Sequence, residues 1–410
     1  MKKILLLPIV MFVMSCNVNR PKALAEGVWR AELQVTETEV LPFNFEVTSR
    51  DALKIFNADE AIMVTDINYS NDTIVFKAPV FEGYIEAVLK NGTLKGNFIK
   101  ESLDRVVPFT ARFGEETRFE LQNQTANADV SGNWETVFSP NNEADRYIAK
   151  GIFRQEGQSV TGTFRTTTGD YRYLEGVMDG DTMKLSTFDG AHAFLFTAKV
   201  TDSTMNGMFY SGNHWEEPFV AKRNASYELP DANDLTFLNE GYDTLEFTFP
   251  DAEGNQVSLS DDRFKNKVVV VQIMGTWCPN CLDESKYYSE FYDTNAEKDI
   301  EFVALAFEYA KTEEKAFQSI KRLKDGIGIQ YPILLAQYGT SSKTEAQEKL
   351  PMLNHVLSYP TSIFIDKKGK VRKIHTGFNG PATGEKFVEF QEEFTTFISE
   401  LLEEEGASAL

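Results

Sequence analysis

Two cysteines three residues apart carry the most evident chemistry of this chain. The motif Cys278-Pro279-Asn280-Cys281 follows the apolar run 268–274, and a proline suits the first helical position, which places Cys278 at an N-cap. One turn of helix brings the two sulfurs within bonding range, and the N–H groups at a helix start stabilise a thiolate. Cys278 is therefore predicted to be an exposed nucleophile, and Cys281 the resolving thiol that attacks a mixed disulfide.

Two other interpretations of the pair stay open. Zinc binding by the cysteines needs two further ligands from His355, His375 or carboxylates, which stand at no recognisable spacing. A purely structural disulfide is the second alternative. The redox interpretation is favoured, because such short loops are more often redox-active than structural. The sequence predicts no metal ion and no cofactor.

A strand, a loop and a helix must hold the pair in place, and the last third of the chain has this pattern. The run 268–274 is almost entirely apolar and rich in β-branched residues, which is typical of a strand buried on both faces of a sheet. Further strands are predicted at 302–307, 331–336, 361–365 and 371–375. Helices are predicted after Cys278, after the cap Thr312 with Gly326 past the end, near 343–353, and at the C-terminus, where Phe387, Phe390, Phe394, Phe397 and Leu401 form a stripe. This alternation predicts an α/β fold.

Three short motifs resemble thioredoxin-fold proteins of the TlpA/ResA type over residues 242–402. They are Trp277 directly before the cysteine pair, Tyr359-Pro360-Thr361 at the start of a strand, and Gly369 in the following turn. The resemblance implies an envelope-anchored thiol–disulfide oxidoreductase. It further implies that Pro360 is cis and lies against the cysteines, and that the backbone of Tyr359 pairs with the substrate. Trp277, Tyr359 and Pro360 are accordingly the predicted substrate-binding residues.

Glu284 is the third predicted catalytic residue. It lies three residues after Cys281 on the same helical face, and it matches an active-site glutamate of ResA-like members. A carboxylate near the resolving sulfur takes its proton as the mixed disulfide collapses. The alternative is a solvated helix residue beside Asp283. Gln272 stands where thioredoxin itself has an acid, so a proton relay there must use another group.

The region before this fold has a β pattern that repeats once. Short alternating segments separated by turns run from 27 to 224. Gly27-Val28-Trp29 matches Gly132-Asn133-Trp134, and Pro108-Phe109 matches Pro218-Phe219. We expect two related all-β antiparallel units, each a sandwich or a lipocalin-like barrel, with both tryptophans in a core. His192 and His214 are predicted to be exposed or hydrogen-bonded rather than metal-bound.

The N-terminus is predicted to be a lipoprotein signal. Lys2 and Lys3 precede the apolar run 4–14, which is too short to span a bilayer, and Val13-Met14-Ser15-Cys16 resembles a bacterial lipobox. Lipidation at Cys16 would anchor the mature chain, because several acyl chains hold a membrane stably. An ordinary signal peptide with a chance cysteine is the alternative. The expected location is the cell envelope, lipid-anchored and facing the periplasm.

These observations give a multidomain architecture. The predicted parts are the signal peptide 1–15, a tether 16–25, β unit 1 at 26–115, β unit 2 at 128–225, a linker 226–240 and a thioredoxin-like domain 241–405. With 41 Lys and Arg against 62 Asp and Glu, the net charge of −21 argues against nucleic-acid binding. At 42% hydrophobic residues the chain is not mainly disordered.

The expected function is the reduction of disulfides in envelope proteins, with a membrane thiol donor as the second partner. One alternative is a binding lipoprotein whose β units recognise a partner or ligand and whose redox module is accessory. The other is a peroxiredoxin-like antioxidant. Gly275 disfavours the latter, because peroxiredoxins have Thr or Ser at that distance before the reactive cysteine.

Overall fold

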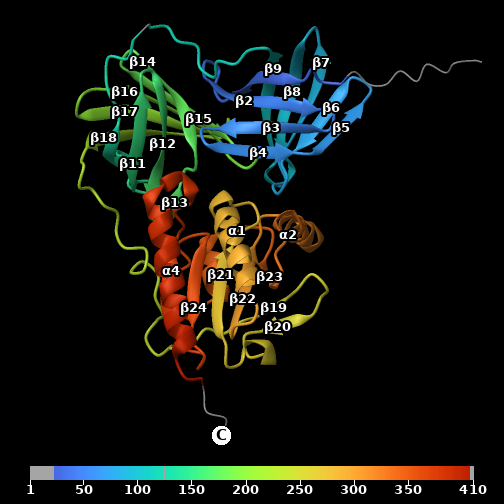
Figure 1. The fold of residues 1–410 in the computed structure, drawn as a ribbon, viewed down its shortest axis with the longest axis vertical. Helices are drawn as coiled ribbons and strands as arrows, with labels where there is room; N and C mark the ends of the chain where they lie inside the picture. The colour runs from blue at the N-terminus through green and yellow to red at the C-terminus, as the bar shows by residue number, and fades with distance from the viewer. Residues whose placement is uncertain (1–22, 124, 407–410) are drawn as a thin grey trace, which may run out of the picture.

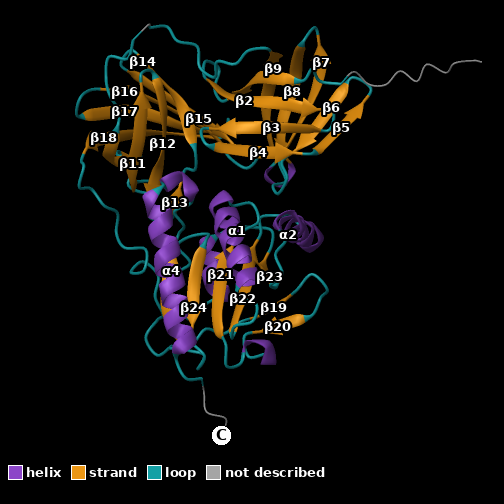
Figure 2. Ribbon diagram, viewed as in Figure 1, coloured by secondary structure: helices purple, strands orange, loops and turns teal. Residues whose placement is uncertain are grey.

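Two β units lie side by side and together face an α/β domain in the computed structural model, which describes residues 23–123 and 125–406 (Figure 1). Cys16, the predicted signal peptide 1–15 and most of the predicted tether lie outside the described residues. Figure 2 shows that the two upper units are built of strands, whereas the long helices belong to the domain below them.

β unit 1 is a single curled antiparallel sheet in the order β4-β3-β2-β1-β9-β8-β7-β6-β5. Its two-residue turn between β7 and β8 uses Asn91 at φ 51° and Gly92 at φ 76°, the left-handed conformations that an Asn-Gly hairpin turn requires. A 3₁₀ turn, Glu101–Leu103, joins β8 to β9. The strands are β1 (Gly27–Gln34), β2 (Val40–Ser49), β3 (Ala52–Asn57), β4 (Glu60–Val64), β5 (Asp66–Ser70), β6 (Thr73–Lys77), β7 (Tyr84–Lys90), β8 (Thr93–Lys100) and β9 (Arg105–Phe113).

β unit 2 closes into a barrel of the kind that the sequence suggests. Its order is β11-β10-β18-β17-β16-β15-β14-β12-β13, and an additional β11–β12 pairing joins the ends of the ring and leaves the short β13 outside it. The strands are β10 (Gly132–Phe138), β11 (Tyr147–Glu156), β12 (Ser159–Thr166), β13 (Gly169–Asp170), β14 (Leu174–Asp179), β15 (Thr182–Phe188), β16 (Ala193–Val200), β17 (Thr204–Ser211) and β18 (Trp215–Arg223).

The first strands of the two units share the same local design. Trp29 and Trp134 are both buried, and each indole N–H donates to the carbonyl four residues earlier, at 3.0 Å and 2.8 Å. Gly27 and Gly132, which precede the tryptophans by two residues, both adopt positive φ, at 120° and 104°. β1 pairs with β9, and β10 pairs in the same way with β18. Both tryptophans are core residues, as expected.

The two units also share a core. The ring of Phe188 from β15 stacks on that of Phe43 from β2, with centroids 4.4 Å apart. The backbone of Phe188 exchanges two hydrogen bonds with the buried Asn57 side chain, at 2.9 Å and 3.1 Å. The buried Arg118, on the connection between the units, donates to the carbonyl of Ser186 at 3.0 Å. The Asn57 amide and one end of the Arg118 guanidinium are therefore paired as they leave water.

The α/β domain has a five-stranded sheet in the order β23-β22-β21-β24-β25, in which β21 runs parallel to β22 and antiparallel to β24. All seven residues of the central β21 are buried, as expected from the apolar run. A hairpin of β19 (Thr248–Pro250) and β20 (Gln256–Ser258) and the 3₁₀ turns Asp262–Phe264 and Pro381–Thr383 complete the domain. The remaining elements are β21 (Val268–Met274), α1 (Pro279–Thr294), β22 (Ile300–Phe307), α2 (Glu313–Ile327), β23 (Ile333–Gln337), α3 (Lys343–Lys349), β24 (Thr361–Ile365), β25 (Val371–Thr376) and α4 (Glu385–Glu403).

Two helix ends differ from the prediction: α3 ends at Lys349 rather than near 353, and α2 ends two residues later than expected. α2 begins at its predicted cap, where the Thr312 hydroxyl accepts from the N–H of Lys315, but it runs through Gly326 and stops at Gly328. Gly328 has φ 78°, the left-handed conformation that ends a helix and that glycine adopts without strain.

The predicted linker 226–240 is packed onto the α/β domain. The N–H of Phe237 donates to Asn354 at 2.9 Å, and that of Asn239 donates to the carbonyl of Met352 at 2.8 Å. Thr236 is buried. Among the helices formed by residues 23–123 and 125–406, none has the length and apolar character needed to cross a membrane.

Candidate active site

The two cysteines lie at the start of α1, at the end of the domain that faces the β units. Cys278 is the N-cap: its sulfur accepts from the N–H of Cys281 at 3.3 Å and lies 3.3 Å from the carbonyl oxygen of Tyr359. Both cysteines are free thiols. Cys278 is 7% exposed and Cys281 is 0% exposed. The expectation of an exposed Cys278 is therefore wrong in degree, although it is the more accessible of the two sulfurs.

The environment of Cys281 disfavours its thiolate. Burial raises the pKa of the Cys281 thiol well above its usual value, and the neighbouring Cys278 and the charge of Glu284 act in the same direction. A neutral Cys281 is a poor nucleophile. This arrangement leaves Cys278 as the sulfur that a substrate can reach first.

Glu284 lies one helical turn beyond Cys281 and is fully buried, so the alternative of a solvated side chain is wrong. Its carboxylate accepts from the Gln272 amide at 2.8 Å and from the Ser362 hydroxyl at 3.0 Å, and the Tyr288 hydroxyl lies 3.2 Å away. Burial raises the pKa of Glu284 to about 7, although these three donors lower it. Glu284 can therefore hold or release a proton near neutral pH.

The predicted substrate-binding residues gather around Cys278. The Tyr359–Pro360 peptide bond is cis, and Pro360 is buried. The Trp277 indole N–H donates to the carbonyl of Phe307 at 3.0 Å, and its ring meets that of Tyr359 with centroids 5.6 Å apart. The structure thus brings six of the seven predicted site residues together, and the seventh, Cys16, lies outside the described residues.

A hairpin of β unit 2, residues 166–172, covers this site; we call it the docking hairpin. The Asn280 amide, between the two cysteines, donates to the carbonyl of Asp170 at 3.0 Å. The Ser358 hydroxyl, next to Tyr359, donates to the carbonyl of Thr168 at 2.8 Å. The docking hairpin therefore touches both the cysteine motif and the loop of the cis proline, on either side of Cys278.

Arg172 anchors the docking hairpin. Its buried guanidinium forms ion pairs with Glu60 of β unit 1, with Asp189 of β unit 2 at 3.3 Å and with Asp283 of α1. It also donates to the carbonyl of Pro279 at 3.2 Å. One side chain thus joins all three parts of the chain at the cysteine motif. The sequence offered no signal for it, because these partners are far away along the chain.

A second buried acid, Glu308, also escaped the sequence analysis. Its carboxylate accepts from the N–H and the hydroxyl of Thr276, at 2.7 Å and 2.8 Å, and so fixes the loop before Trp277. Burial raises the pKa of Glu308 to about 7. Glu308 directly follows β22, whose carboxyl end lies beside that of β21. The sequence feature that points to Glu308 is an acidic residue directly after a buried parallel strand.

Cys278 opens into a cleft of about 790 Å³ between β unit 2 and the α/β domain, here called the active-site cleft. Trp277 and Tyr359 line one side and residues of β unit 2 line the other. On that far side Tyr147 lies 2.5 Å from the hydroxyl of Tyr171 and donates to the buried Glu217 at 2.8 Å. The walls that meet a substrate therefore come from both parts of the chain.

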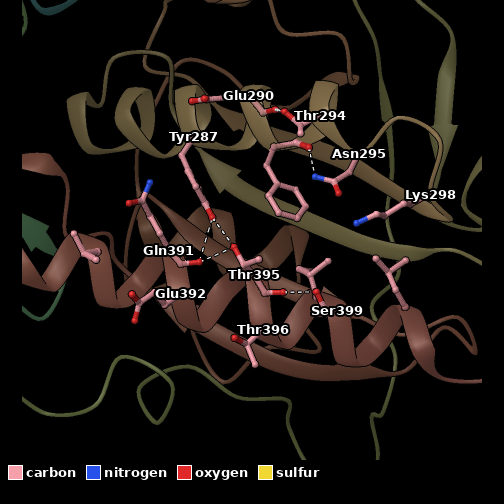
Figure 3. Close-up of a pocket in the computed structure, with 14 residues that line it drawn as sticks. Tyr287, Glu290, Thr294, Asn295, Lys298, Gln391, Glu392, Thr395, Thr396 and Ser399 are labelled. Atoms are coloured by element: carbon pink, nitrogen blue, oxygen red, sulfur yellow. Dashed lines mark hydrogen bonds between the residues drawn. The ribbon is translucent and has the colours of Figure 1, made fainter.

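A larger groove, of about 840 Å³, lies between α1 and α4 (Figure 3). Its Tyr287 hydroxyl reaches the carbonyl of Gln391 and the hydroxyl of Thr395, each at 3.4 Å. No cysteine lines this groove, so it is separate from the redox chemistry. Within the described part of the chain, no group of three or more His, Cys, Asp or Glu is arranged to hold a metal ion.

The α/β domain is similar to known redox proteins. A family model described as Redoxin matches residues 239–387. The thiol-disulfide oxidoreductase ResA of Bacillus thuringiensis subsp. konkukian is 31% identical over 155 residues, which are 38% of this chain and 78% of that protein. The thioredoxin-like protein YneN of Bacillus subtilis is 28% identical over 140 residues, 34% of this chain and 73% of its own length.

Solved structures show the same kind of likeness. A thiol-disulfide oxidoreductase from Bacteroides fragilis matches 36% of this chain and 99% of its own, at 22% identity and a TM-score of 0.27. The identity and coverage of the ResA relative, together with a buried strand that leads into the cysteine pair and a cis proline beside it, determine the family. The chain belongs to the TlpA/ResA-like family of thioredoxin-fold thiol–disulfide oxidoreductases.

Proposed function

We propose that the protein reduces disulfides in proteins of the cell envelope, anchored to the membrane by a lipid on Cys16 and facing the periplasm. The observation that carries this proposal is the pairing of a reachable Cys278 with a fully buried, neutral Cys281 beside a titratable Glu284. The acidic surface and the lack of a long basic stretch speak against nucleic acid as a partner.

The reaction begins when the Cys278 thiolate attacks one sulfur of a client disulfide. A Cys278–client bond forms, the client S–S bond breaks, and the other client sulfur leaves as a thiolate. Cys281 then attacks the sulfur of Cys278, forming the intramolecular disulfide and releasing the second client thiolate. The client gains two electrons, and the cysteine pair loses them.

Glu284 supplies the base for the second step. Cys281 must lose its proton before it attacks, and burial makes that loss difficult without a nearby acceptor. With a pKa of about 7, a large fraction of Glu284 is ionised at neutral pH and can take the proton. Gln272 cannot do so, because its amide does not titrate, but it holds the carboxylate in place.

The same burial supports the proposed reducing direction. A thioredoxin-fold protein becomes an oxidant when its reduced form is stabilised, for example as a thiolate. Here burial raises the pKa of Cys281, so the reduced pair gains little from ionisation. Equilibration with glutathione should give the Cys278–Cys281 pair a reduction potential of about −270 mV, as in thioredoxin. Strongly oxidising members of the fold have a potential of about −120 mV.

The cycle needs a source of electrons. A membrane protein that donates from its own thiols is the proposed partner, since it restores both thiols by the same exchange chemistry. The anchor keeps the oxidised protein near such a donor. Replacing Cys16 with Ala is expected to move the mature protein from the membrane to the soluble fraction, and unchanged membrane association would refute the anchor.

Trapping tests the mechanism. In Cys281→Ser the second step is blocked, so mixed disulfides with envelope proteins should accumulate on Cys278 and be found by mass spectrometry. Cys278→Ser, the matched control, should trap none. Empty traps, or faster labelling of Cys281 than of Cys278 by iodoacetamide, would refute the assignment.

A further inference from the structure

A second, smaller pocket adjoins the active-site cleft where the two β units and the α/β domain meet. It has a volume of about 310 Å³, near the lower end of ligand-binding pockets. Its basic lining residues are Lys100, Arg105, His192 and His214, and no Asp or Glu is among the residues that line it. We call it the basic pocket. In a chain of net charge −21, a pocket without acidic lining is unusual.

In the part of the chain that the structure describes, Lys100 and Arg105, the two most basic residues of the pocket, keep hydrogen-bond donors that no other group uses. Lys100 is 9% exposed and its ammonium group donates to the carbonyl of Ala191 at 3.0 Å, which leaves two of its three N–H groups for other acceptors. Among residues 23–123 and 125–406, Arg105 forms no ion pair with a carboxylate, and the group that acts on its charge is the Tyr309 hydroxyl. Both side chains therefore retain donors that an incoming anion can use.

Burial and neighbouring positive charge both act on the basic groups of the pocket. Burial, together with the charges of Arg105 and Lys100, lowers the pKa of His214 to about 4. Burial and the charge of Arg105 lower the pKa of Lys100 to about 8. A bound anion would oppose both shifts.

Two acids near the pocket, Asp189 and Glu308, have partners of their own. Asp189 is held by Arg172 at 3.3 Å and lies 3.4 Å from the ring of His192. Glu308 is held by Thr276. Glu82 and Asp189 both act on the charge of Lys100, and Glu82 also acts on the Tyr309 hydroxyl, from outside the lining.

The basic pocket shares three wall residues with the active-site cleft. His192, Phe194 and Trp277 line both of them, and Trp277 directly precedes Cys278. A polypeptide segment attached to Cys278 therefore reaches the basic pocket along the ring of Trp277. The walls contributed by Phe98 and Tyr309 suit the aliphatic stem of a side chain, while the cations suit its end.

We propose that the basic pocket binds a side-chain carboxylate of the client segment whose cysteine is linked to Cys278. The inference rests on the proposed function and narrows its substrate class to disulfides with an Asp or Glu close by in the sequence. A carboxylate gains charge-assisted hydrogen bonds from Lys100 and Arg105 in a partly dry site. The pocket also gives an acidic client a local attraction that the overall charge of the protein does not provide.

The experiment uses the reduced full-length protein and symmetric disulfide dimers of short, terminally blocked peptides. Each peptide has one cysteine and either a Glu or a Gln, placed at each flanking position in turn. The rate constant of peptide reduction is measured at low salt. For at least one position we expect the Glu peptide to react about tenfold faster than its Gln counterpart, as a charge-assisted hydrogen bond implies. Raising the salt concentration should shrink this ratio.

Two variants show whether the ratio comes from the basic pocket. Arg105→Gln should bring the Glu/Gln ratio close to one. Lys95→Met removes the same charge from the exposed Lys95 on the same strand as Lys100, and it should leave both rates unchanged. Arg105 is only half-buried, so this variant is expected to fold, and circular dichroism checks that.

The outcomes separate this inference from the proposed function. Equal rates for Glu and Gln peptides at every position, or a ratio that survives in Arg105→Gln, would overturn the basic pocket as a carboxylate site. Failure to reduce any of the peptides would instead count against the proposed function.

Discussion

Replacing Arg172 with Met tests whether the docking hairpin shields the active site. The change keeps an apolar side chain but removes a buried cation that joins Glu60, Asp189 and Asp283. Removing one partner of a buried ion pair costs about 3 to 5 kcal/mol, because the remaining carboxylates stay desolvated. The lower end applies here, since burial already raises the pKa of Glu60 and this acid can take up a proton instead.

Part of that cost falls on the contact between β unit 2 and the α/β domain, because Asp283 is the partner on α1. If the whole of about 3 kcal/mol fell on this contact, the equilibrium between docked and undocked hairpin would shift by roughly 150-fold, which is the upper bound, since 1.4 kcal/mol is a factor of ten. Cys278 is 7% exposed when the hairpin is docked, so undocking should expose its sulfur. We expect iodoacetamide to modify Cys278 faster in Arg172→Met than in the unaltered protein, as measured by mass spectrometry of the reduced protein.

A matched control and a double mutant sharpen this test. Arg154→Met removes the same charge from a side chain of β unit 2 that is 78% exposed and pairs with Glu156 at the surface, and it should leave the labelling rate unchanged. Asp283→Asn added to Arg172→Met should restore part of the protection, because one unpaired carboxylate is gone. Equal labelling of Cys278 in Arg172→Met and Arg154→Met would refute the shielding role.

Three further predictions concern buried groups. The first compares the free energy of unfolding of Glu284→Gln with that of the unaltered protein. The difference, variant minus unaltered protein, should increase as the pH goes from 4.5 to 7. A raised pKa means that the protonated acid stabilises the fold at low pH and that this contribution is lost as pH rises through about 7. The difference should approach roughly 3 kcal/mol in denaturant titrations, and a difference that does not vary with pH would refute it. Glu308→Gln should cost about 1 to 3 kcal/mol in unfolding of the α/β domain, because an amide cannot accept from both donors of Thr276, and an unchanged midpoint would contradict this. Trp134→Phe should destabilise more than Trp29→Phe in calorimetry, because its indole bond lies deeper, and the reverse order would argue against that reasoning.

Much of the redox centre could be predicted from sequence, because it depends on local patterns. An apolar run followed by a proline-started helix defines the position of Cys278, and the spacing along one helix defines that of Cys281 and Glu284. The choice between Gly326 and Gly328 as the end of α2 could not be made in this way, since two nearby glycines satisfy the same pattern.

Features made by contacts between distant segments gave no sequence signal. The docking hairpin contacts the cysteine motif from more than 100 residues earlier in the chain. Arg172 carries no sequence signal, because its role depends on carboxylates of three separate segments. The alternation of apolar and polar residues predicted the strands, but it could not show which β unit closes into a barrel. Closure of β unit 2 depends on the pairing of β11 with β12.

The pairing of the first and last strands in each β unit also bears on how such a protein evolves. Because β1 lies beside β9 and β10 beside β18, the chain enters and leaves each unit at neighbouring points. Tandem duplication of a segment with adjacent ends needs only a short connector, here residues 114–131, and leaves the first copy intact. One copy can then keep the ancestral packing while the other diverges at a single hairpin and acquires a new neighbour.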